Sequence, residues 1–216
     1  MRAILTDIEG TTTSISFVAD VLFIHAREHL AEYVAAHPEE TAPILAEVAA
    51  TGESDPVATL IRWIDEDRKV TPLKTLQGMI WADGYISGAF TGHVYDDAVA
   101  GLRRFHAAGV ALYVFSSGSV AAQKLLFGHS DAGDLTPLFS GYFDTTTGPK
   151  REAASYAAIA REIDVPPEEI LFLSDTPEEV GAAQKAGLNA LLIDRERGRG
   201  DIASFDDIKL TVHTVQ

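Results

Sequence analysis

The sequence predicts an α/β protein with a doubly wound, parallel-sheet, Rossmann-like core and an inserted all-helical cap. Two observations predict this fold class. Beyond residue 92, short apolar runs alternate with helical patterns, which is typical of parallel strands joined by crossover helices. Between the first apolar run and that alternation, residues 16–92 show only helical spacing. We therefore expect a core domain over 1–15 and 93–216, and a helical cap domain over 16–92.

The first expected strand is the apolar run 3–6, which stops at Asp7. A loop with Gly10 and three threonines follows it. In the expected cap, apolar residues recur at helical spacing, as in Val18, Val21 and Leu22. Proline and glycine residues separate the helices of this segment: Pro38, Pro43, Gly52, Pro56 and Pro72.

In the second half of the chain the expected strands are apolar runs that suit buried parallel strands. They cover residues 110–115, 142–143, 170–173 and 190–193. The expected helices cover residues 97–108, a stretch after Ser119, and residues 150–163 and 178–186. Residues 195–200 are polar and rich in glycine, so we expect a loop there.

The composition excludes several kinds of protein. A formal net charge of -15 argues against nucleic acid as a general partner, because phosphate backbones need clustered Lys and Arg. The sequence has no cysteine, which excludes disulfides and thiolate metal sites and fits a cytoplasmic protein. No run of about 18 apolar residues occurs, so we expect no membrane span. The apolar run at the N-terminus is too short for a signal peptide.

Polar residues follow several expected strands, at the edge of a parallel sheet where active sites lie. Asp7 and Glu9 follow the first strand, Ser116 follows the second, and Asp175 follows the strand 170–173. Lys150 is expected to open a helix after a Gly-Pro turn. Taken singly, each residue has an ordinary explanation as a turn former, a helix cap or a solvated lysine. Their order along the chain favours one shared site.

These residue types suit phosphoryl transfer. The Asp7 carboxylate is able to attack phosphorus and form an aspartyl phosphate. Asp7 and Asp175 together suit Mg²⁺, which prefers hard oxygen ligands. Lys150 adds positive charge, and the Ser116 hydroxyl with nearby backbone N–H groups at a helix N-terminus is able to hold phosphate oxygens. Glu9 is placed to give a proton to the leaving group and later to take one from water.

The four polar segments resemble the four motifs of the haloacid dehalogenase superfamily. The first is the segment from Asp7 to Thr11, the second is Val114 to Ser117, the third is Lys150, and the fourth is Ser174 to Glu179. In the fourth segment an acid follows Asp175 four positions later. An insertion between the first two motifs resembles the helical cap of one branch of that superfamily.

Glu9 stands where superfamily phosphatases usually carry Asp. This Glu, the threonine run and the segments 14–18, 70–81, 92–95 and 116–130 resemble the enolase-phosphatase family of methionine salvage, also called acireductone synthases. The resemblance extends from Ile4 to about residue 194. Residues 24–25 are Ile-His where that family is expected to have Pro-Tyr.

The resemblance implies a Mg²⁺-dependent, cytoplasmic, monomeric enzyme that acts on a phosphorylated diketone. It would enolise 2,3-diketo-5-methylthiopentyl-1-phosphate and then dephosphorylate it to acireductone (1,2-dihydroxy-3-keto-5-methylthiopentene). Its metal ligands would be Asp7 and Asp175 through their side chains and Glu9 through its backbone carbonyl. Phosphate contacts would come from Ser116, Ser117, Gly118 and Lys150.

The sequence also leaves alternatives open. A general Mg²⁺-dependent phosphatase for small metabolites would keep the same four motifs. A binding module that lost its chemistry would keep only the fold. Four apolar cap residues are candidates for contacting the thioether tail, although such side chains more often form only the core of a domain: Phe17, Leu76, Met79 and Trp81.

Overall fold

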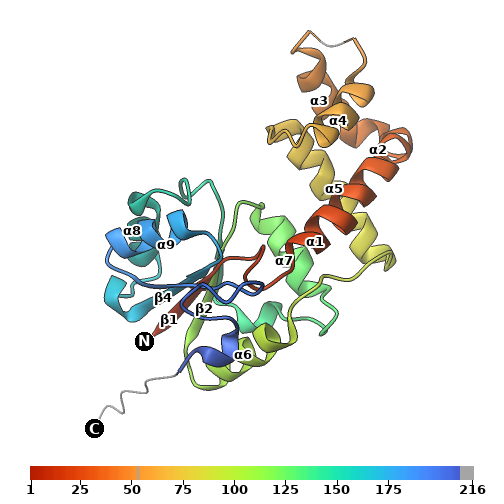
Figure 1. The fold of residues 1–216 in the computed structure, drawn as a ribbon. Coiled ribbons are helices and arrows are strands. Elements are labelled where there is room, and N and C mark those ends of the chain that lie inside the picture. Colours follow the sequence, from red (N-terminus) through yellow and green to blue (C-terminus); the bar gives the residue numbers. More distant parts are fainter. Residues whose placement is uncertain (53, 210–216) are drawn as a thin grey trace. The chain divides into compact units, whose positions relative to one another are not determined.

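The computed structural model describes residues 1–52 and 54–209, and Figure 1 shows the course of the chain. The chain separates into two compact units. The core unit consists of Met1–Ile15 and the described residues from Gly92 onward, and the helical unit consists of the described residues of Ser16–Thr91. The core unit is therefore formed from two segments that are far apart in the sequence.

The core unit contains a five-stranded parallel sheet with the strand order β3-β2-β1-β4-β5. The strands are β1 (Ala3–Thr6), β2 (Ala111–Phe115), β3 (Gly141–Phe143), β4 (Ile170–Ser174) and β5 (Asn189–Leu192). β1 lies at the centre, where Thr6 pairs with Val114 on one side and with Leu173 on the other. The strand order reverses beside β1, and such a switch point is where open parallel sheets bind ligands. The predicted α/β core is confirmed.

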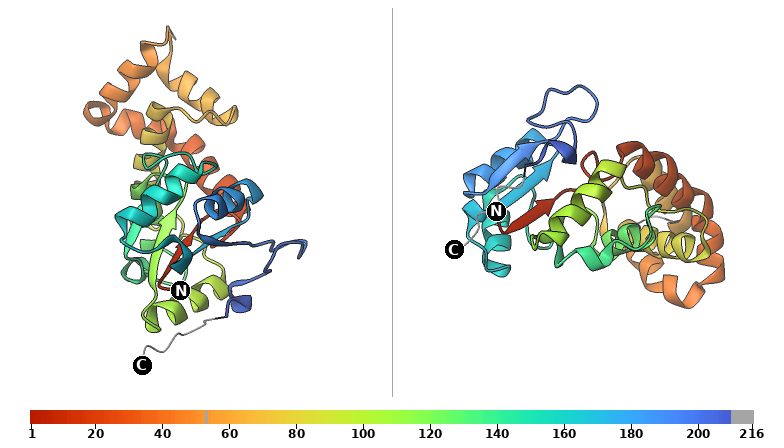
Figure 2. Two further views of the ribbon diagram at one scale, coloured as in Figure 1. Left: turned by 90° about the vertical axis from the view of Figure 1, so that its left-hand side faces the viewer. Right: turned by 90° about the horizontal axis from the view of Figure 1, so that it is seen from below.

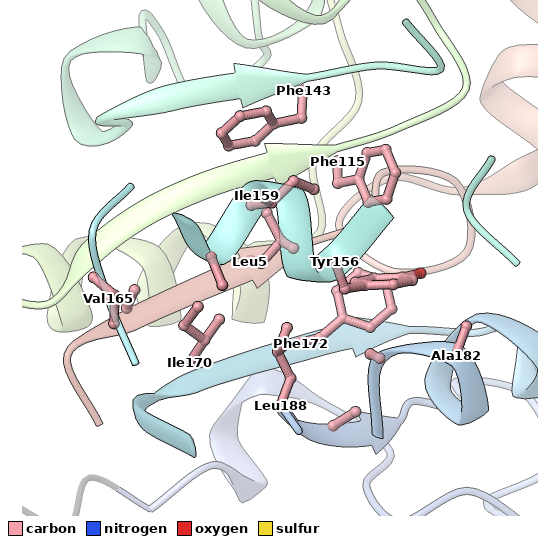
Figure 3. Packing of buried hydrophobic residues seen from close by; sticks show 14 of the residues in the cluster. Leu5, Phe115, Phe143, Tyr156, Ile159, Val165, Ile170, Phe172, Ala182 and Leu188 are labelled. Atoms are coloured by element: carbon pink, nitrogen blue, oxygen red, sulfur yellow. The ribbon is translucent and has the colours of Figure 1, made fainter. Parts of the chain in front are cut away.

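Helices cover both faces of the sheet (Figure 2), so the central strands β1 and β4 are buried along their whole length. On one face, α8 (Ala153–Glu162) and α9 (Pro177–Lys185) pack on the sheet, and Figure 3 shows this cluster. The fully buried Tyr156 ring meets Phe115 and Phe172 edge-on, with ring centroids 5.4 and 4.9 Å apart. On the other face α6 (Asp96–Ala107) packs against β2 (Figure 2). This packing fixes the carboxyl ends of the strands.

The remaining elements of the core unit are short. They are α7 (Val120–Gly128) and the 3₁₀ turns η2 (Thr136–Leu138), η3 (Pro167–Glu169) and η4 (Phe205–Asp207). α7 begins directly after the loop that follows β2. η4 begins with a capping box, in which the Ser204 hydroxyl accepts from a backbone N–H and the Asp207 carboxylate accepts from the Ser204 N–H.

Every regular element of the helical unit is a helix, within its described residues. A three-residue turn, α1 (Ile15–Phe17), leads into the π-helical segment η1 (Val18–Phe23), which is followed by α2 (Ile24–Ala36), α3 (Pro38–Ala49), α4 (Pro56–Asp65) and α5 (Thr71–Ser87). The sequence pattern did not distinguish the π-helix from an α-helix. The Trp81 indole N–H donates to the carbonyl of Leu22 in this segment at 2.8 Å. None of the described helices combines the length and apolarity needed to cross a membrane.

The four apolar residues singled out in the sequence differ in exposure. Leu76 is fully buried in the core of the helical unit, beside Leu30 and Leu60. Met79 and Trp81 pack against that cluster and are partly buried. For Leu76 the packing favours a core role. Contact with a substrate tail stays a prediction for the other three.

Candidate active site

The segment after β1 forms a closed turn that begins at Asp7. The carbonyl of Ile8 accepts the N–H groups of Thr11, Thr12 and Thr13 at 3.1, 2.9 and 2.9 Å. The Thr12 hydroxyl donates to the carbonyl of Asp7 at 3.2 Å. We expected a polar loop here, and all three of its threonines are fully buried. The backbone N–H groups of all three threonines and the hydroxyls of Thr12 and Thr13 bond within the protein, so the turn holds Asp7 in a defined position.

Asp7 lies next to a buried lysine that is shared by two carboxylates. The Lys150 ammonium is 2.6 Å from Asp7 Oδ1 and 2.7 Å from Glu179 Oε2. Glu179 also accepts a hydrogen bond from the Ser174 hydroxyl at 2.9 Å. The lysine side chain is only 7% exposed, so water screens these ion pairs weakly. Three regions of the sequence thus meet in one charged cluster.

The prediction that Lys150 opens a helix is wrong. Helix α8 begins at Ala153, and Lys150 lies in the turn before it. Side chains of α8 hold this turn by its carbonyls: Tyr156 donates to the carbonyl of Lys150 at 2.7 Å, and Ser155 donates to that of Pro149, also at 2.7 Å. The turn, rather than the helix, therefore positions the ammonium group.

Burial and neighbouring charges shift the pKa values of the cluster. Burial alone would lower the pKa of Lys150, but attraction by Asp7 and Glu179 outweighs it and raises that pKa above its usual value. Lys150 therefore stays protonated at neutral pH. Burial, and then repulsion by Asp7, raise the pKa of Glu179, and Lys150 offsets part of this rise.

Asp175 follows β4 and lies against the turn after β1. Burial, followed by the negative charge of Asp7, raises the pKa of Asp175, although the Thr176 hydroxyl donates to Asp175 Oδ1 at 3.1 Å. Gly10 has a φ of +70° and carries no side chain where Asp175 passes. A Cβ atom at residue 10 would overlap Asp175 Oδ2. Glycine at this position therefore allows the positive φ of the turn and leaves room for the Asp175 carboxylate.

We predict that Gly10→Ala reduces stability and turnover together. A positive φ costs a residue with a Cβ about 1–2 kcal/mol, and displacing Asp175 brings the total to roughly 2–5 kcal/mol. Phosphate release should fall about tenfold or more, because the carboxylate is displaced. Urea unfolding and a phosphate-release assay measure the two effects.

The matched control is Gly109→Ala. Gly109 has a φ of +78°, but a Cβ there meets no atom within 4 Å. This variant should show only the conformational cost and keep its turnover. Equal losses of stability in the two variants would show that Asp175 does not need the space over Gly10.

The loop after β2 contains three of the four candidate phosphate-binding residues, all except Lys150. Ser116 is buried, Ser117 is exposed, and Gly118 is partly buried. The Gly118 N–H donates to the Ser116 hydroxyl at 3.3 Å. The buried Gln123 amide donates to the carbonyls of Gly118 and Phe143 at 2.8 and 2.9 Å, which ties this loop to the end of β3. The parallel register places the loop beside the turn after β1.

The structure brings some of the predicted site residues into contact and places others only nearby. Asp7 and Lys150 are in direct contact, and Asp175 interacts electrostatically with both. Ser116 follows the neighbouring strand, and Glu9 is exposed at the corner of the turn after β1. The sequence pattern did not indicate Glu179 as a site residue. Its spacing of four residues from Asp175 on the helix start was the available signal, but the pattern did not indicate an ion pair with Lys150.

The cluster suits a divalent cation. Three carboxylates, of Asp7, Asp175 and Glu179, face one ammonium group, which leaves two negative charges in excess. Burial raises the pKa of Asp175 most, and repulsion by Asp7 adds to it; a cation there would relieve that repulsion. Among residues 1–52 and 54–209, no group of three or more His, Cys, Asp or Glu side chains, this cluster included, is arranged so that its side chains alone could hold a metal ion. Mg²⁺ needs few carboxylates, because water, backbone carbonyls and substrate oxygens complete its shell.

The chain is similar to known hydrolases over most of its length. The family model of haloacid dehalogenase-like hydrolases matches residues 1–187. Enolase-phosphatase E1 of Pseudomonas aeruginosa (strain UCBPP-PA14) is 57% identical, covering 96% of this chain and 98% of that protein. Enolase-phosphatase E1 of Methylococcus capsulatus (strain Bath) is 56% identical, covering 92% of this chain and 91% of that protein.

The chain is also similar to solved structures. The crystal structure of the UTR4 protein of Saccharomyces cerevisiae superimposes with a TM-score of 0.78 at 36% identity, covering 89% of each chain. CbbY from Rhodobacter sphaeroides, solved in complex with phosphate, superimposes with a TM-score of 0.59 at 21% identity over 96% of each chain, which shows the shared fold. The family expected from the motifs is confirmed. The chain belongs to the enolase-phosphatase E1 family of the haloacid dehalogenase-like hydrolases.

Proposed function

We propose that this chain enolises 2,3-diketo-5-methylthiopentyl-1-phosphate and then dephosphorylates it to acireductone in methionine salvage. The observation that carries the proposal is Asp7, a buried carboxylate held by Lys150 at the carboxyl end of the central strand. Family membership and Glu9 at the second position after Asp7 support the enolase-phosphatase activity over that of a general phosphatase.

In the phosphatase step, a carboxylate oxygen of Asp7 attacks phosphorus, and the bond from phosphorus to the substrate oxygen breaks. Glu9 gives the departing oxygen a proton. Water then attacks the aspartyl phosphate, Glu9 takes a proton from it, and the bond from phosphorus to Asp7 breaks, releasing inorganic phosphate. Lys150 stays charged and offsets the negative charge that the phosphate brings to Asp7.

We infer that phosphate oxygens bind the loop after β2. The Ser116 and Ser117 hydroxyls and the backbone N–H groups around Gly118 supply donors, and Lys150 supplies charge. Asp7 and Asp175 would hold Mg²⁺ through their side chains, and Glu9 through its backbone carbonyl. When bound, Mg²⁺ would stabilise negative charge on the phosphate and on the enolate oxygens.

We also propose roles for the two units. The core unit would correspond to the catalytic domain, expected over 1–15 and 93–216, and the helical unit to the cap, expected over 16–92. The cap would supply apolar contacts to the thioether tail of the substrate. The candidates for that contact are the buried Phe17 and the partly buried Met79 and Trp81.

A coupled assay on the diketone phosphate tests the function. In the presence of Mg²⁺, ultraviolet absorbance should report enol formation and a colorimetric assay should report phosphate release in the same tube. Removing Mg²⁺ with a chelator should abolish phosphate release. Turnover of a panel of sugar phosphates at equal or higher rates would favour a general phosphatase, and no turnover of any ester would favour a binding module.

A further inference from the structure

Arg195 is a partly buried arginine outside the cluster of Asp7, Lys150 and Glu179. It follows β5, in the segment that the sequence indicated only as a polar loop. Its Nε donates to the carbonyl of Thr11 at 2.9 Å, and its Nη1 donates to Asp97 Oδ1 at 2.9 Å. The guanidinium carbon lies 4.0 Å from the centroid of the Tyr95 ring, and the side chain is 12% exposed. The arginine therefore joins the turn after β1 to the start of α6.

The bond to Thr11 fixes the outer side of the turn that carries Glu9. Because a trans peptide points its carbonyl and its N–H in opposite directions, the Thr11 carbonyl faces Arg195 while the Thr12 N–H faces the carbonyl of Ile8 at 2.9 Å. The peptide group between Thr11 and Thr12 thus connects Arg195 to the carbonyl of Ile8. Glu9 is exposed and lies in the same turn, two residues before Thr11.

The partners of Arg195 hold it rigidly. Asp97 accepts from Arg195 with Oδ1 and from the backbone N–H of Phe205 with Oδ2, the latter at 2.8 Å. Although burial opposes ionisation, these bonds lower the pKa of Asp97, so the ion pair persists at neutral pH. A planar guanidinium is able to donate in two directions while stacked on a ring, whereas a lysine ammonium is a single point charge.

We propose that Arg195 is a positioning residue, which holds the turn after β1 so that Glu9 reaches its proton-transfer partner. The proposal rests on the proposed function, since it takes Glu9 as the acid and base. The leaving oxygen belongs to an enol, whose anion is comparatively stable, so release of the first product depends little on a proton from Glu9. Hydrolysis of the aspartyl phosphate depends on Glu9 more, because water must lose a proton as it attacks phosphorus.

The test is Arg195→Lys, assayed on the diketone phosphate with Mg²⁺. We expect kcat to fall about tenfold to a hundredfold, since a small misplacement of a catalytic group has an effect of that size. The fraction of enzyme that carries a phosphoryl group, measured by mass spectrometry after acid quenching, should rise at steady state. A loss of folded protein would lower kcat without raising this fraction.

Arg104→Lys is the matched control. The Arg104 guanidinium donates to the carbonyls of Phe205 and Ile208 and lies 4.9 Å from the Phe105 ring centroid, and neither of these bonds reaches the turn after β1. This variant should keep both kcat and the phosphorylated fraction. If Arg195→Lys does not fold, Asp97→Asn weakens the same support from its other end and should raise the fraction to a smaller extent.

Glu9→Gln separates the outcomes. If Glu9→Gln accumulates phosphorylated enzyme and neither Arg195→Lys nor Asp97→Asn does, the positioning role of Arg195 is wrong and the proposed function stands. If Glu9→Gln itself does not accumulate it, Glu9 is not the base, and the proposed mechanism fails together with this inference. The double variant Arg195→Lys with Glu9→Gln gives a further check. If its kcat is no lower than that of Glu9→Gln alone, Arg195 acts through Glu9.

Discussion

Asp7→Asn should abolish phosphate release, with a fall in kcat of roughly 10⁴-fold or more, as expected when a covalent nucleophile is removed. An amide is too weak a nucleophile to attack phosphorus. The substitution also replaces the negative partner 2.6 Å from the Lys150 ammonium by a neutral group of the same shape. Phosphate release and mass spectrometry of the quenched protein measure the effect, and no phosphorylated protein should appear.

Asp134→Asn controls for the change from carboxylate to amide. Asp134 accepts hydrogen bonds from the N–H and the hydroxyl of Thr136 at 2.9 and 2.6 Å, in an exposed turn far along the chain from β1. Its turnover should stay within about twofold of the unmodified protein, since exposed substitutions have small effects. Retention of full turnover by Asp7→Asn would exclude Asp7 as the nucleophile.

Lys150→Met should have the largest effect on stability. It leaves Asp7 and Glu179 buried without their shared cation, and breaking a buried ion pair from one side costs about 3–5 kcal/mol. Loss of the charge beside the phosphate should also lower kcat by roughly 10²–10³-fold. Urea unfolding and phosphate release measure the two losses separately. The exposed pair of Lys69 and Asp67 supplies the control, since Lys69→Met should cost less than about 1 kcal/mol.

The loss of stability in Lys150→Met should depend on pH. Burial and repulsion by Asp7 already raise the pKa of Glu179, and removing Lys150 raises it further. A carboxyl group whose pKa is higher in the folded than in the unfolded state destabilises the fold above its folded pKa and not below its unfolded pKa. The deficit of Lys150→Met should therefore shrink as the pH is lowered through that range.

A double variant separates stability from chemistry. Lys150→Met with Glu179→Gln removes one of the two stranded charges, so part of the lost stability should return. Turnover should not return, because the positive charge beside Asp7 is still missing. A double variant with restored turnover would show that Lys150 acts only in holding the fold.

The positions at strand ends were predictable because their signals are local. Apolar runs indicate buried parallel strands, and the topology brings their carboxyl ends to one edge of the sheet. Asp7, Ser116 and Asp175 were identified from this rule and from the motifs. Each lies within two residues of a strand that the structure confirms.

Contacts between distant segments were not predictable in this way. Asp7 and Ser174 meet although 167 residues separate them, and Thr11 and Arg195 meet across 184 residues. Nothing in the local pattern around Glu179 or Arg195 distinguishes a buried ion pair from a solvated charge. The turn at Lys150 was mistaken for a helix because its stabilising bonds come from Ser155 and Tyr156, further along the chain.

The central position of β1 has a consequence for how the chain acquires its native state during synthesis. β1 is made first, yet both strands that flank it, β2 and β4, begin more than 100 residues later. Closing such distant pairs costs loop entropy and slows folding. The described helices of residues 16–91 make local contacts and are able to form on the ribosome while β1 still lacks its partners. Asp7 should therefore be among the last residues to become protected, only after β4 has emerged.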